Sequence, residues 1–300
     1  MLAAALLSSL AVEPASPELI EPQQPQGPAV AAVLVAHNQR EALTRCLKSL
    51  DASSVRPRME IIVVDSGSSD GSGRVDEEFE GVTVLRLPRD FGRTRARNIG
   101  LRTAKAELLL FTDPAVEFEP RAVEAMMAAL DADPQAAAAV PAFRSPAGET
   151  LPCGRAFPSA STLKRASLDG APLPESPSLE AIADWAFLIR RPVLKGMNGF
   201  DDKRFSEHWA ELEMCWQIRN AGKRIVAAPG AAAILHPAPP VRDQTLLAAD
   251  RVSGAASYLA KRNGLLAGLL FRLSCAFTAL SSGRLSLFTA ILSASRVDPT

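Results

Sequence analysis

Polar side chains follow three of the short apolar runs in the first part of the chain. His37 and Asn38 come after AAVLVA, Asp65 follows EIIVV, and Asp113 follows ELLLF. Because the carboxyl ends of parallel strands meet at one edge of an open sheet, where ligands bind, these side chains are expected to converge there. Asn38 taken alone is more often a helix cap or a turn former. The three positions together predict a ligand site.

The loop SGSSDGSG directly follows Asp65 and adds small residues at the same edge. Its backbone N–H groups allow a nucleotide to approach closely. The sequence has no GxGxxG at a strand-helix junction and no GxxxxGK[ST]. The dinucleotide-binding and P-loop classes therefore lose their main support.

The apolar runs predict alternating strands and helices. Short β-branched runs begin at residue 29 and are separated by amphipathic stretches, which is typical of an α/β fold with a mostly parallel sheet flanked by helices. We expect four strands before residue 112, with helices between them. The strands are Ala31 to Ala36, Glu60 to Val64, Val82 to Leu87 and Glu107 to Phe111, and the helices lie around Leu43 to Leu50 and Arg93 to Ala104.

The pattern after residue 112 is less regular. Pro120 in a first turn predicts a helix that ends between Asp131 and Pro134. Residues 141–178 are rich in Pro, Ser and Gly and predict a long loop over the sheet. Order is expected to return with residues 179–190, a turn at 196–199, a helix over 211–220 and a strand over 224–228.

Composition limits the function classes. The 300 residues carry 33 Lys or Arg and 33 Asp or Glu, so no general attraction to nucleic acid is expected. The sequence contains no run of about 18 apolar residues, so it predicts no membrane-spanning helix. The cysteines form no CxxC pair, which fits neither a disulfide scaffold nor a common zinc spacing, and indicates thiols of a reducing, cytoplasmic compartment. They are Cys46, Cys153, Cys215 and Cys275.

Residues 1–28 differ in composition from the rest of the chain. A short apolar start gives way to EPASPELIEPQQPQGP, which is typical of a disordered extension. A secretory signal peptide is the alternative for Leu2 to Val12. It is disfavoured because the stretch lacks a positive n-region and a good small-residue cleavage pattern.

Residues 241–300 form a basic tail with seven basic and three acidic residues. Leucines recur in it at helical spacing, which predicts amphipathic helices. Two interpretations stay open: the leucines pack on the domain or on another chain, or they lie on an anionic membrane surface. The leucines are Leu266, Leu269, Leu273 and Leu280.

Four segments between residues 29 and 240 keep a common order and spacing. They are AVLVAHNQREALTRCLKSL, EIIVVDSGSSDGS, FGRTRARNIGLRTAKAELLLFTDPAVEFEP, and the stretch that starts at FLIRRPVLKGMNGF and ends at ILHP. Together they resemble the nucleotide-sugar domain of family 2 glycosyltransferases, especially the rhamnosyltransferase-like branch. The resemblance implies a Rossmann-like GT-A domain over residues 29–240, and inverting sugar transfer from a nucleotide diphosphate sugar to a hydroxyl acceptor.

The resemblance also implies roles for the acids at the strand ends. Asp65 matches the aspartate that hydrogen-bonds the nucleoside, and Asn38 falls in the first nucleotide-contacting turn. Asp113 matches the first acid of the DxD motif, which in the family binds a divalent metal, Mn or Mg. The last acid of that motif is replaced by Ala115, so the metal is expected to bind weakly or not at all.

The family's helix motif, Glu-Asp-x-Asp, corresponds to residues 210–213, which read AELE. The resemblance implies that Glu211 is the catalytic base, which takes a proton from the acceptor hydroxyl as this attacks the anomeric carbon. Glu213 lies two positions on and faces elsewhere, as an exposed carboxylate near the helix N-terminus. His236 matches a histidine that assists the metal or the diphosphate.

Arginines at the start of the predicted helix after residue 92 add positive charge near the implied diphosphate. Arg97 is the one we place in the nucleotide site, and Arg93 and Arg95 are its neighbours. Solvated side chains are the alternative for all three.

The sequence thus predicts an enzyme of cell-envelope or polysaccharide synthesis, with a glycan or lipid-linked acceptor and no nucleic-acid partner. It is expected in the cytoplasm, with peripheral contact at the inner face of the membrane through the tail. The alternative is a degenerate member that binds a nucleotide sugar without turnover, or a scaffolding protein. The retention of acids at positions 65, 113 and 211 favours the active enzyme.

Overall fold

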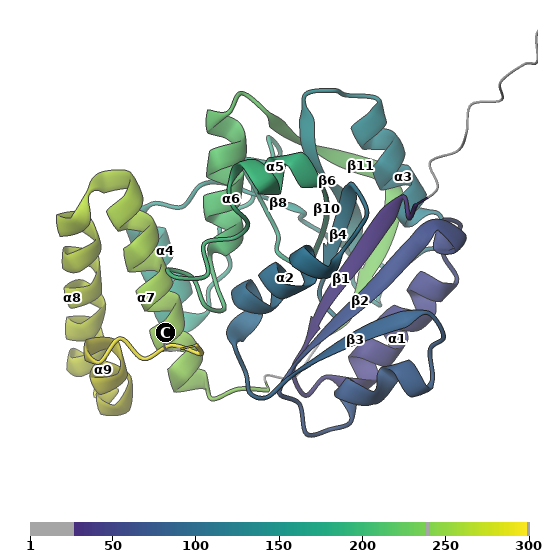
Figure 1. Cartoon of the computed structure of the whole chain (residues 1–300). Coiled ribbons are helices and arrows are strands. Elements are labelled where there is room, and N and C mark those ends of the chain that lie inside the picture. Colours follow the sequence, from purple (N-terminus) through teal and green to yellow (C-terminus); the bar gives the residue numbers. More distant parts are fainter. Residues whose placement is uncertain (1–26, 238–240, 299–300) are drawn as a thin grey trace, which may run out of the picture.

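A computed structural model of the chain describes residues 27–237 and 241–298. The predicted disordered extension, residues 1–28, lies outside the described residues except for its last two positions. The described part is a mixed α/β structure with a central sheet and a C-terminal group of helices (Figure 1).

The central sheet has nine strands in the described residues, in the order β3-β2-β1-β4-β10-β6-β11-β5, with β7 paired to β6. A separate two-stranded sheet joins β8 to β9. The strands are β1 (Val30–Ala36), β2 (Met59–Ser66), β3 (Val82–Leu87), β4 (Leu108–Thr112), β5 (Val116–Phe118), β6 (Ala136–Arg144), β7 (Thr150–Leu151), β8 (Gly154–Arg155), β9 (Ala181–Ile182), β10 (Ala186–Arg190) and β11 (Arg224–Leu235).

The first four strands of the sheet order run parallel, as the sequence predicts, so the ends of β1, β2 and β4 share one edge. β10 is antiparallel to both β4 and β6, whereas β6 and β11 are parallel. The α/β fold is confirmed. The antiparallel β10 has a consequence for the site, because the start of β10 lies beside the end of β4.

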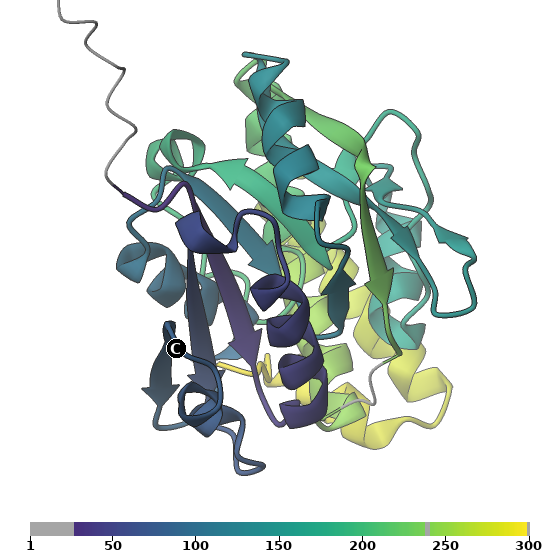
Figure 2. The same ribbon diagram turned by 90° about the vertical axis from the view of Figure 1, so that its right-hand side faces the viewer.

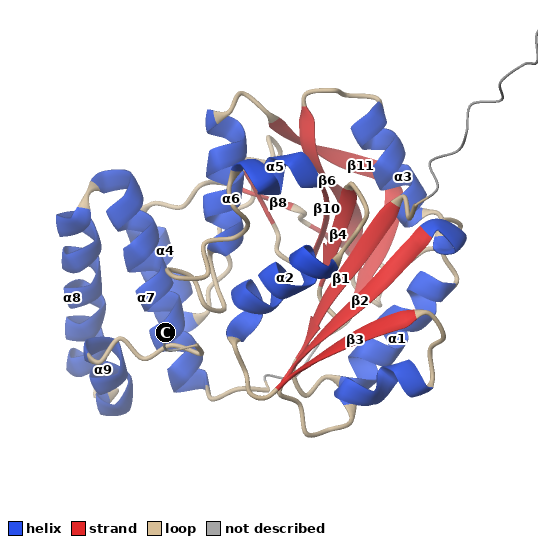
Figure 3. Ribbon diagram, viewed as in Figure 1, coloured by secondary structure: helices blue, strands red, loops and turns tan. Residues whose placement is uncertain are grey.

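Helices cover both faces of the sheet (Figure 3). Figure 2 shows α1 and α3 in front of one face, with the C-terminal helices behind. The helices are α1 (Arg40–Asp51), α2 (Gly92–Thr103), α3 (Ala122–Asp131), α4 (Ala160–Asp169), α5 (Arg191–Gly196), α6 (Ala210–Asn220), α7 (Gln244–Asn263), α8 (Leu265–Ser281) and α9 (Leu285–Leu292), with short 3₁₀ turns at Arg56–Arg58 and Ser72–Glu77.

The β1 strand shows why two layers of helices are needed. Its side chains alternate, so that Ala31 and Val33 face the core shared with α2, α6 and α7, while Ala32 and Leu34 face the core shared with α1 and α3. All four are buried. A strand buried on both faces is expected at the centre of a parallel sheet.

The stretch 141–178, expected to be a long loop, instead contains the end of β6, the short strands β7 and β8, and α4. In α4 the Ser159 side chain accepts a hydrogen bond from the Thr162 N–H, and Gly170 ends the helix in a left-handed conformation. Leu163 and Leu168 are buried. Ser159 and Gly170 are typical helix-capping residues, but the many Pro, Ser and Gly around them favoured the prediction of a loop.

The basic tail forms the helices α7, α8 and α9, as predicted. It is not separable from the rest, because Tyr258 and Val252 of α7 belong to the same buried core as the sheet. The leucines used for the prediction do not pack on the domain: Leu266 and Leu269 are 67% and 54% exposed.

The described helices include none with the length and apolar composition needed to cross a bilayer. The four cysteines are free thiols. Three of them are buried, and Cys153 is half-buried.

Candidate active site

The turn after β1 is tied to the loop after β2 by Asn38. Asn38 has a left-handed backbone (φ 52°), which asparagine tolerates better than most residues. Its N–H donates to Ser68 Oγ at 2.9 Å, and its Oδ1 accepts from the Ser69 N–H at 2.8 Å. The amide oxygen thus holds the two loops together at the predicted nucleotide edge.

Asp65 is the last residue but one of β2 and is buried. One oxygen, Oδ1, accepts from the Ser68 N–H at 3.3 Å. The other, Oδ2, lies so close to Gly73 that a Cβ there would be 2.6 Å away. The loop glycine therefore permits the backbone to cross directly over the carboxylate.

Asp113 lines a cavity of 210 Å³ at the carboxyl ends of β1 and β4. Its Oδ1 caps the following turn by accepting from the Ala115 N–H at 2.9 Å. Its Oδ2 lies 3.3 Å from a guanidinium nitrogen of Arg93. The other residues that line the cavity are Val35, His37, Gln39, Arg93, Glu207, His208, Val241, Arg242 and Leu247.

Arg93 is the charge centre of this cavity. Besides Asp113, its guanidinium contacts Asp184 Oδ2 at 2.9 Å and Glu207 Oε1 at 3.5 Å, and its backbone N–H donates to Glu207 Oε2 at 2.8 Å. Burial opposes the charged form, but the surrounding carboxylates outweigh it and raise the pKa of Arg93. Arg93 therefore joins acids from three separate parts of the chain.

Arg97, which we placed in the nucleotide site, does not line the cavity. It is 4% exposed and donates to Asp184 Oδ1 at 2.6 Å. Its guanidinium carbon lies 5.6–6.0 Å from the ring centres of three phenylalanines, among them Phe187. A nucleotide would have to displace Asp184 to reach it. Arg93, and not Arg97, is the arginine of α2 that lines the cavity.

Glu211 lies at the start of α6 and is buried. Burial, followed by the negative charge of Asp184, raises its pKa from 4.5 to about 8, although Arg97 and Arg93 act in the opposite direction. A carboxyl group with a pKa near neutrality suits proton transfer. Glu211 and Asp113 share Arg93 as a neighbouring positive charge. Like Arg97, Glu211 does not itself line the 210 Å³ cavity.

Glu213 faces away from this group, but it is not the exposed carboxylate that the sequence suggested. It is buried and forms an ion pair with Lys261 of α7. It also accepts from Gln217 Nε2 at 3.0 Å. Its contacts are those of a helix-helix ion pair.

The start of the tail also lines the cavity, through Val241, Arg242 and Leu247. Arg242 donates to both oxygens of Asp90, at 2.6 and 3.1 Å, and to Glu207 Oε1 at 3.1 Å. Asp250 is 2% exposed and accepts from His208 Nδ1 and from the Glu207 N–H, both at 3.2 Å. The start of α7 is therefore part of the site.

The metal ligands implied by the resemblance are not assembled. His236 does not face Asp113; its Nε2 lies 2.7 Å from Glu117 Oε2. Asp113 is occupied by Arg93 and by the Ala115 N–H, and Ala115 is buried and has no side-chain oxygen. Over residues 27–237 and 241–298, no group of three His, Cys, Asp or Glu side chains could hold a metal ion. In this arrangement Asp113 and His236 do not form a joint ligand set for a divalent metal.

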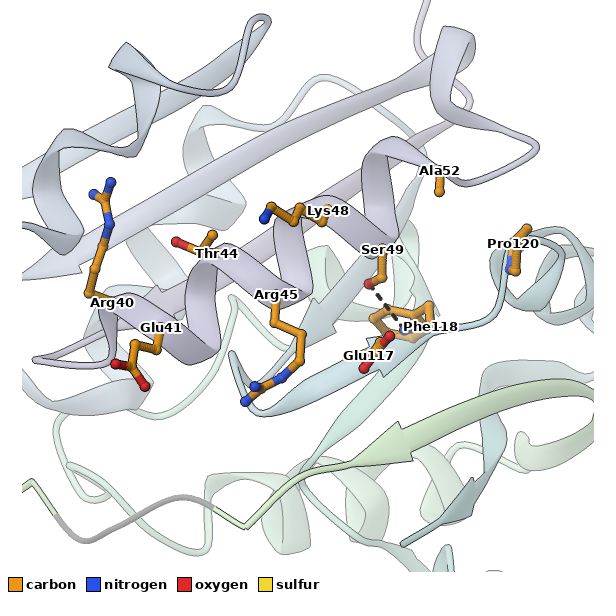
Figure 4. A pocket seen from close by; sticks show the side chains of 10 residues that line it. All are labelled: Arg40, Glu41, Thr44, Arg45, Lys48, Ser49, Ala52, Glu117, Phe118 and Pro120. Carbon is orange, nitrogen blue, oxygen red and sulfur yellow. Dashed lines mark hydrogen bonds between the residues drawn. The ribbon is translucent and has the colours of Figure 1, made fainter. Parts of the chain in front are cut away.

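A larger hollow of 620 Å³ lies elsewhere, on the outer side of α1 (Figure 4). Arg40, Arg45 and Lys48 of α1 project around it, and Glu117 and Phe118 border it. The Phe118 N–H donates to Ser49 Oγ at 3.1 Å and ties β5 to α1. None of the predicted site residues lines this hollow.

Sequence reasoning missed Asp184, Glu207 and Arg242. Asp184 stands just before β10, and an expectation of parallel strands would place it at the wrong edge of the sheet. Because β10 is antiparallel, with Ala186 opposite Thr112, Asp184 meets the end of β4. Asp184 could be predicted as a site residue only if the antiparallel direction of β10 were known.

The geometry can be compared with known proteins. Residues 31–193, more than half of the chain, match the family model described as glycosyl transferase family 2. The chain is 26% identical over 215 residues to a pre-mycofactocin glycosyltransferase of Mycobacterium tuberculosis, covering 69% of this chain and 43% of that protein. The chain thus spans less than half the length of this relative.

A second relative is covered more fully. The N-acetylglucosaminyl-diphospho-decaprenol L-rhamnosyltransferase of Mycobacterium tuberculosis is 24% identical over 233 residues, covering 69% of this chain and 75% of that protein.

Two solved structures share the fold. GalNAc-T7 with UDP, GalNAc and Mn²⁺ superposes with a TM-score of 0.60 at 19% identity, covering 77% of this chain and 47% of that one. Staphylococcus aureus TarS 1-349 in complex with UDP-GlcNAc superposes with a TM-score of 0.58 at 16% identity, covering 90% and 81%. The family match and these folds agree with the resemblance drawn from the motifs, and the chain belongs to glycosyl transferase family 2.

Proposed function

We propose that this protein transfers a sugar from a nucleotide diphosphate sugar to a hydroxyl acceptor, with inversion at the anomeric carbon. The observation that carries the proposal is the family match over residues 31–193, together with Glu211, a buried carboxyl group at the start of α6 whose pKa is raised to about 8 by burial and by Asp184. A carboxyl group with a pKa in this range is suited to accept the proton of a hydroxyl group.

In the proposed reaction Glu211 accepts the proton of the acceptor hydroxyl as that oxygen attacks the anomeric carbon. The new glycosidic bond forms as the bond to the diphosphate oxygen breaks, and its electron pair leaves with the nucleoside diphosphate. Arg93 and Arg242 line the same cavity as Asp113 and supply positive charge for the leaving group. Asp65 and Asn38 hold the nucleoside at the adjoining loops.

We propose that the donor site works with little or no help from a divalent metal. The relatives' structures with Mn²⁺ belong to proteins of the same fold, but here Asp113 faces Arg93 and His236 faces Glu117. No step of the proposed transfer depends on a metal ion.

The acceptor is proposed to be a glycan or a lipid-linked sugar of cell-envelope or polysaccharide synthesis, with the enzyme at the cytoplasmic face of the membrane. The support is the relative whose name gives a decaprenol-linked acceptor. The match covers 75% of that protein. A nucleic-acid partner is not proposed, because the chain carries no net charge.

The second candidate is a member of the family that binds a nucleotide sugar without turnover. Ala115 favours it, because the DxD motif is incomplete. Incubation of the full chain with UDP-, dTDP- and GDP-sugars and hydroxyl acceptors separates the two. We expect acceptor-dependent release of nucleoside diphosphate, and NMR of the product gives the anomeric configuration. Thermal stabilisation by a donor without any release would support the second candidate.

A further inference from the structure

The outward side of α8 is a continuous apolar surface, which we call the α8 outer face. It consists of Leu266, Leu269, Leu270, Leu273, Phe277 and Leu280, with exposures from 44% for Leu280 to 70% for Phe277. Apart from the adjacent Leu269 and Leu270, successive positions are three or four residues apart, and they therefore form one stripe along the helix. Isolated exposed leucines are normal on protein surfaces, but a contiguous stripe marks an interaction site.

The rest of the described chain does not cover this face. α8 packs on α7 through its opposite side, where a Cβ on Gly268 would lie 2.5 Å from the Ala256 carbonyl oxygen, and where Phe271 and Cys275 are buried. Figure 1 shows α8 as the outermost helix, on the far side of α7 from the sheet. The large exposed apolar side chains of the described residues all lie between residues 265 and 292.

The surroundings of the face are basic. Residues 251–297 contain no Asp or Glu, whereas they contain six basic residues: Arg251, Lys261, Arg262, Arg272, Arg284 and Arg296. Acids of other elements compensate two of these charges, because Lys261 pairs with Asp201 and Glu213, and Arg284 pairs with Asp169. Arg272 of α8 donates only to the carbonyl oxygens of Ile291 and Leu292, so no carboxylate of the described residues compensates its charge. Lys164 of α4 reaches α8 as well, with its Nζ 2.7 Å from Ser274 Oγ.

The positive charge around the α8 outer face distinguishes between a second copy of the chain and a membrane as its binding partner. A second copy of the chain docked through the same face would bring the uncompensated Arg272 of each copy into one interface, and like charges in contact disfavour such an arrangement. A membrane with anionic lipids offers the opposite charge at its surface and apolar chains directly below it. We propose that the α8 outer face docks on an anionic membrane surface.

The helix lies along that surface and does not cross it. α8 has 17 residues and is followed after a short turn by α9, and neither spans a bilayer. Docked in this way, α8 and α9 form the contact layer, and α7 connects them to the candidate active site.

The test is vesicle sedimentation of the full chain with phosphatidylcholine vesicles, with and without phosphatidylglycerol. We expect binding to the anionic vesicles, weaker binding to the neutral ones, and partial release by salt. The triple variant Leu269→Gln, Leu273→Gln, Phe277→Gln should lower the vesicle partition constant by about tenfold or more, because three large apolar side chains no longer enter the interface.

A matched control is Ser281→Gln with Ser286→Gln, two exposed polar positions of the same helical region. It should bind vesicles as the parent does. The thermal midpoint and circular dichroism of each variant show that the fold is kept, and all substituted positions are exposed.

Three results would overturn the proposal. One is equal sedimentation of the triple variant and the parent. Another is a dimer in light scattering that the triple variant converts to a monomer, with no vesicle binding by the parent. The third is vesicle binding that appears only after deletion of residues 1–26, since that segment would then be the occupant of the face.

Discussion

Glu211 and Glu213 are two residues apart on α6 and lie among different charged groups. Glu211 is held near Asp184 and the two arginines, whereas Glu213 pairs with Lys261. We expect Glu211→Gln to lower the rate of transfer by about 10²-fold or more, because it removes the proton acceptor and keeps the shape. Donor binding, measured by calorimetry, should change little.

Glu213→Gln is the matched control for this prediction. It breaks a buried ion pair and should lower the thermal midpoint, but the turnover of the folded fraction should stay near the parent's. The assignment of the base is wrong if the loss of transfer follows Glu213 rather than Glu211.

The raised pKa of Glu211 also predicts how stability depends on pH. Its pKa is about 8 in the folded protein against a usual 4.5, so between these values the folded state binds more protons than the unfolded state. The contribution of Glu211 to the free energy of unfolding therefore falls as pH rises through this window. In Glu211→Gln that fall should be absent.

Urea unfolding at several values between about pH 5 and pH 8 measures this difference. The gap in stability between the variant and the parent should widen in favour of the variant as pH rises. A constant gap would mean that burial does not raise the pKa of Glu211.

Ala115 is the residue that departs from the family's acidic motif. In Ala115→Asp a second carboxylate would stand close to Asp113, and mutual repulsion should lower the thermal midpoint without metal. Manganese with nucleotide should restore stability more strongly than in the parent, because hard oxygen ligands favour the cation.

Ala115→Asn is a control of the same size without the charge. It should show no additional stabilisation by manganese. If the parent already binds manganese tightly by titration calorimetry, a ligand set other than Asp113 and His236 holds the metal.

At the scale of elements, the sequence predicted the parallel core well and the edges poorly. β3 matches its predicted bounds and β1 begins one residue early, because β-branched runs between amphipathic stretches have few other interpretations. The direction of β10 leaves no trace in its own residues, AFLIR, since a buried strand looks the same in either direction. For that reason the acids at positions 65 and 113 could be found and Asp184 could not.

The tail gives a further prediction at this scale. From composition, removing it from Asp250 onward would leave nucleotide binding intact. In the structure Asp250 accepts from the Glu207 N–H, and Tyr258 and Val252 are buried in the main core. We therefore expect this truncation to unfold the protein or to abolish donor binding, because it opens the core and the cavity together.

Circular dichroism and the donor-induced thermal shift of the truncated chain measure this effect. Truncation after Asn263, which removes α8 and α9 but keeps α7, is the comparison. It exposes fewer core residues and should retain more of the donor response. Full stability after truncation at Asp250 would contradict the packing of α7 against the main core.

At the scale of the whole molecule, charge and apolar surface are distributed unevenly although the net charge is zero. Acids gather around Arg93 and Arg242 at the cavity, whereas residues 251–297 have none. The composition of residues 241–300 predicts the basic tail, but the net charge of the whole chain does not predict the group of acids at the cavity. The proposed reaction takes place at the cavity where the acids gather, and the proposed membrane contact is made by the acid-free residues 251–297.

The helix α7 closes the cavity with one end and supports α8 along its flank. Donor binding and lipid binding would then be linked through a single rigid element, and thermodynamic linkage is reciprocal. If donor binding raises the affinity for vesicles by some factor, vesicle binding must raise the affinity for the donor by the same factor. An enzyme built in this way would need no separate effector site for the membrane to tune its use of substrate.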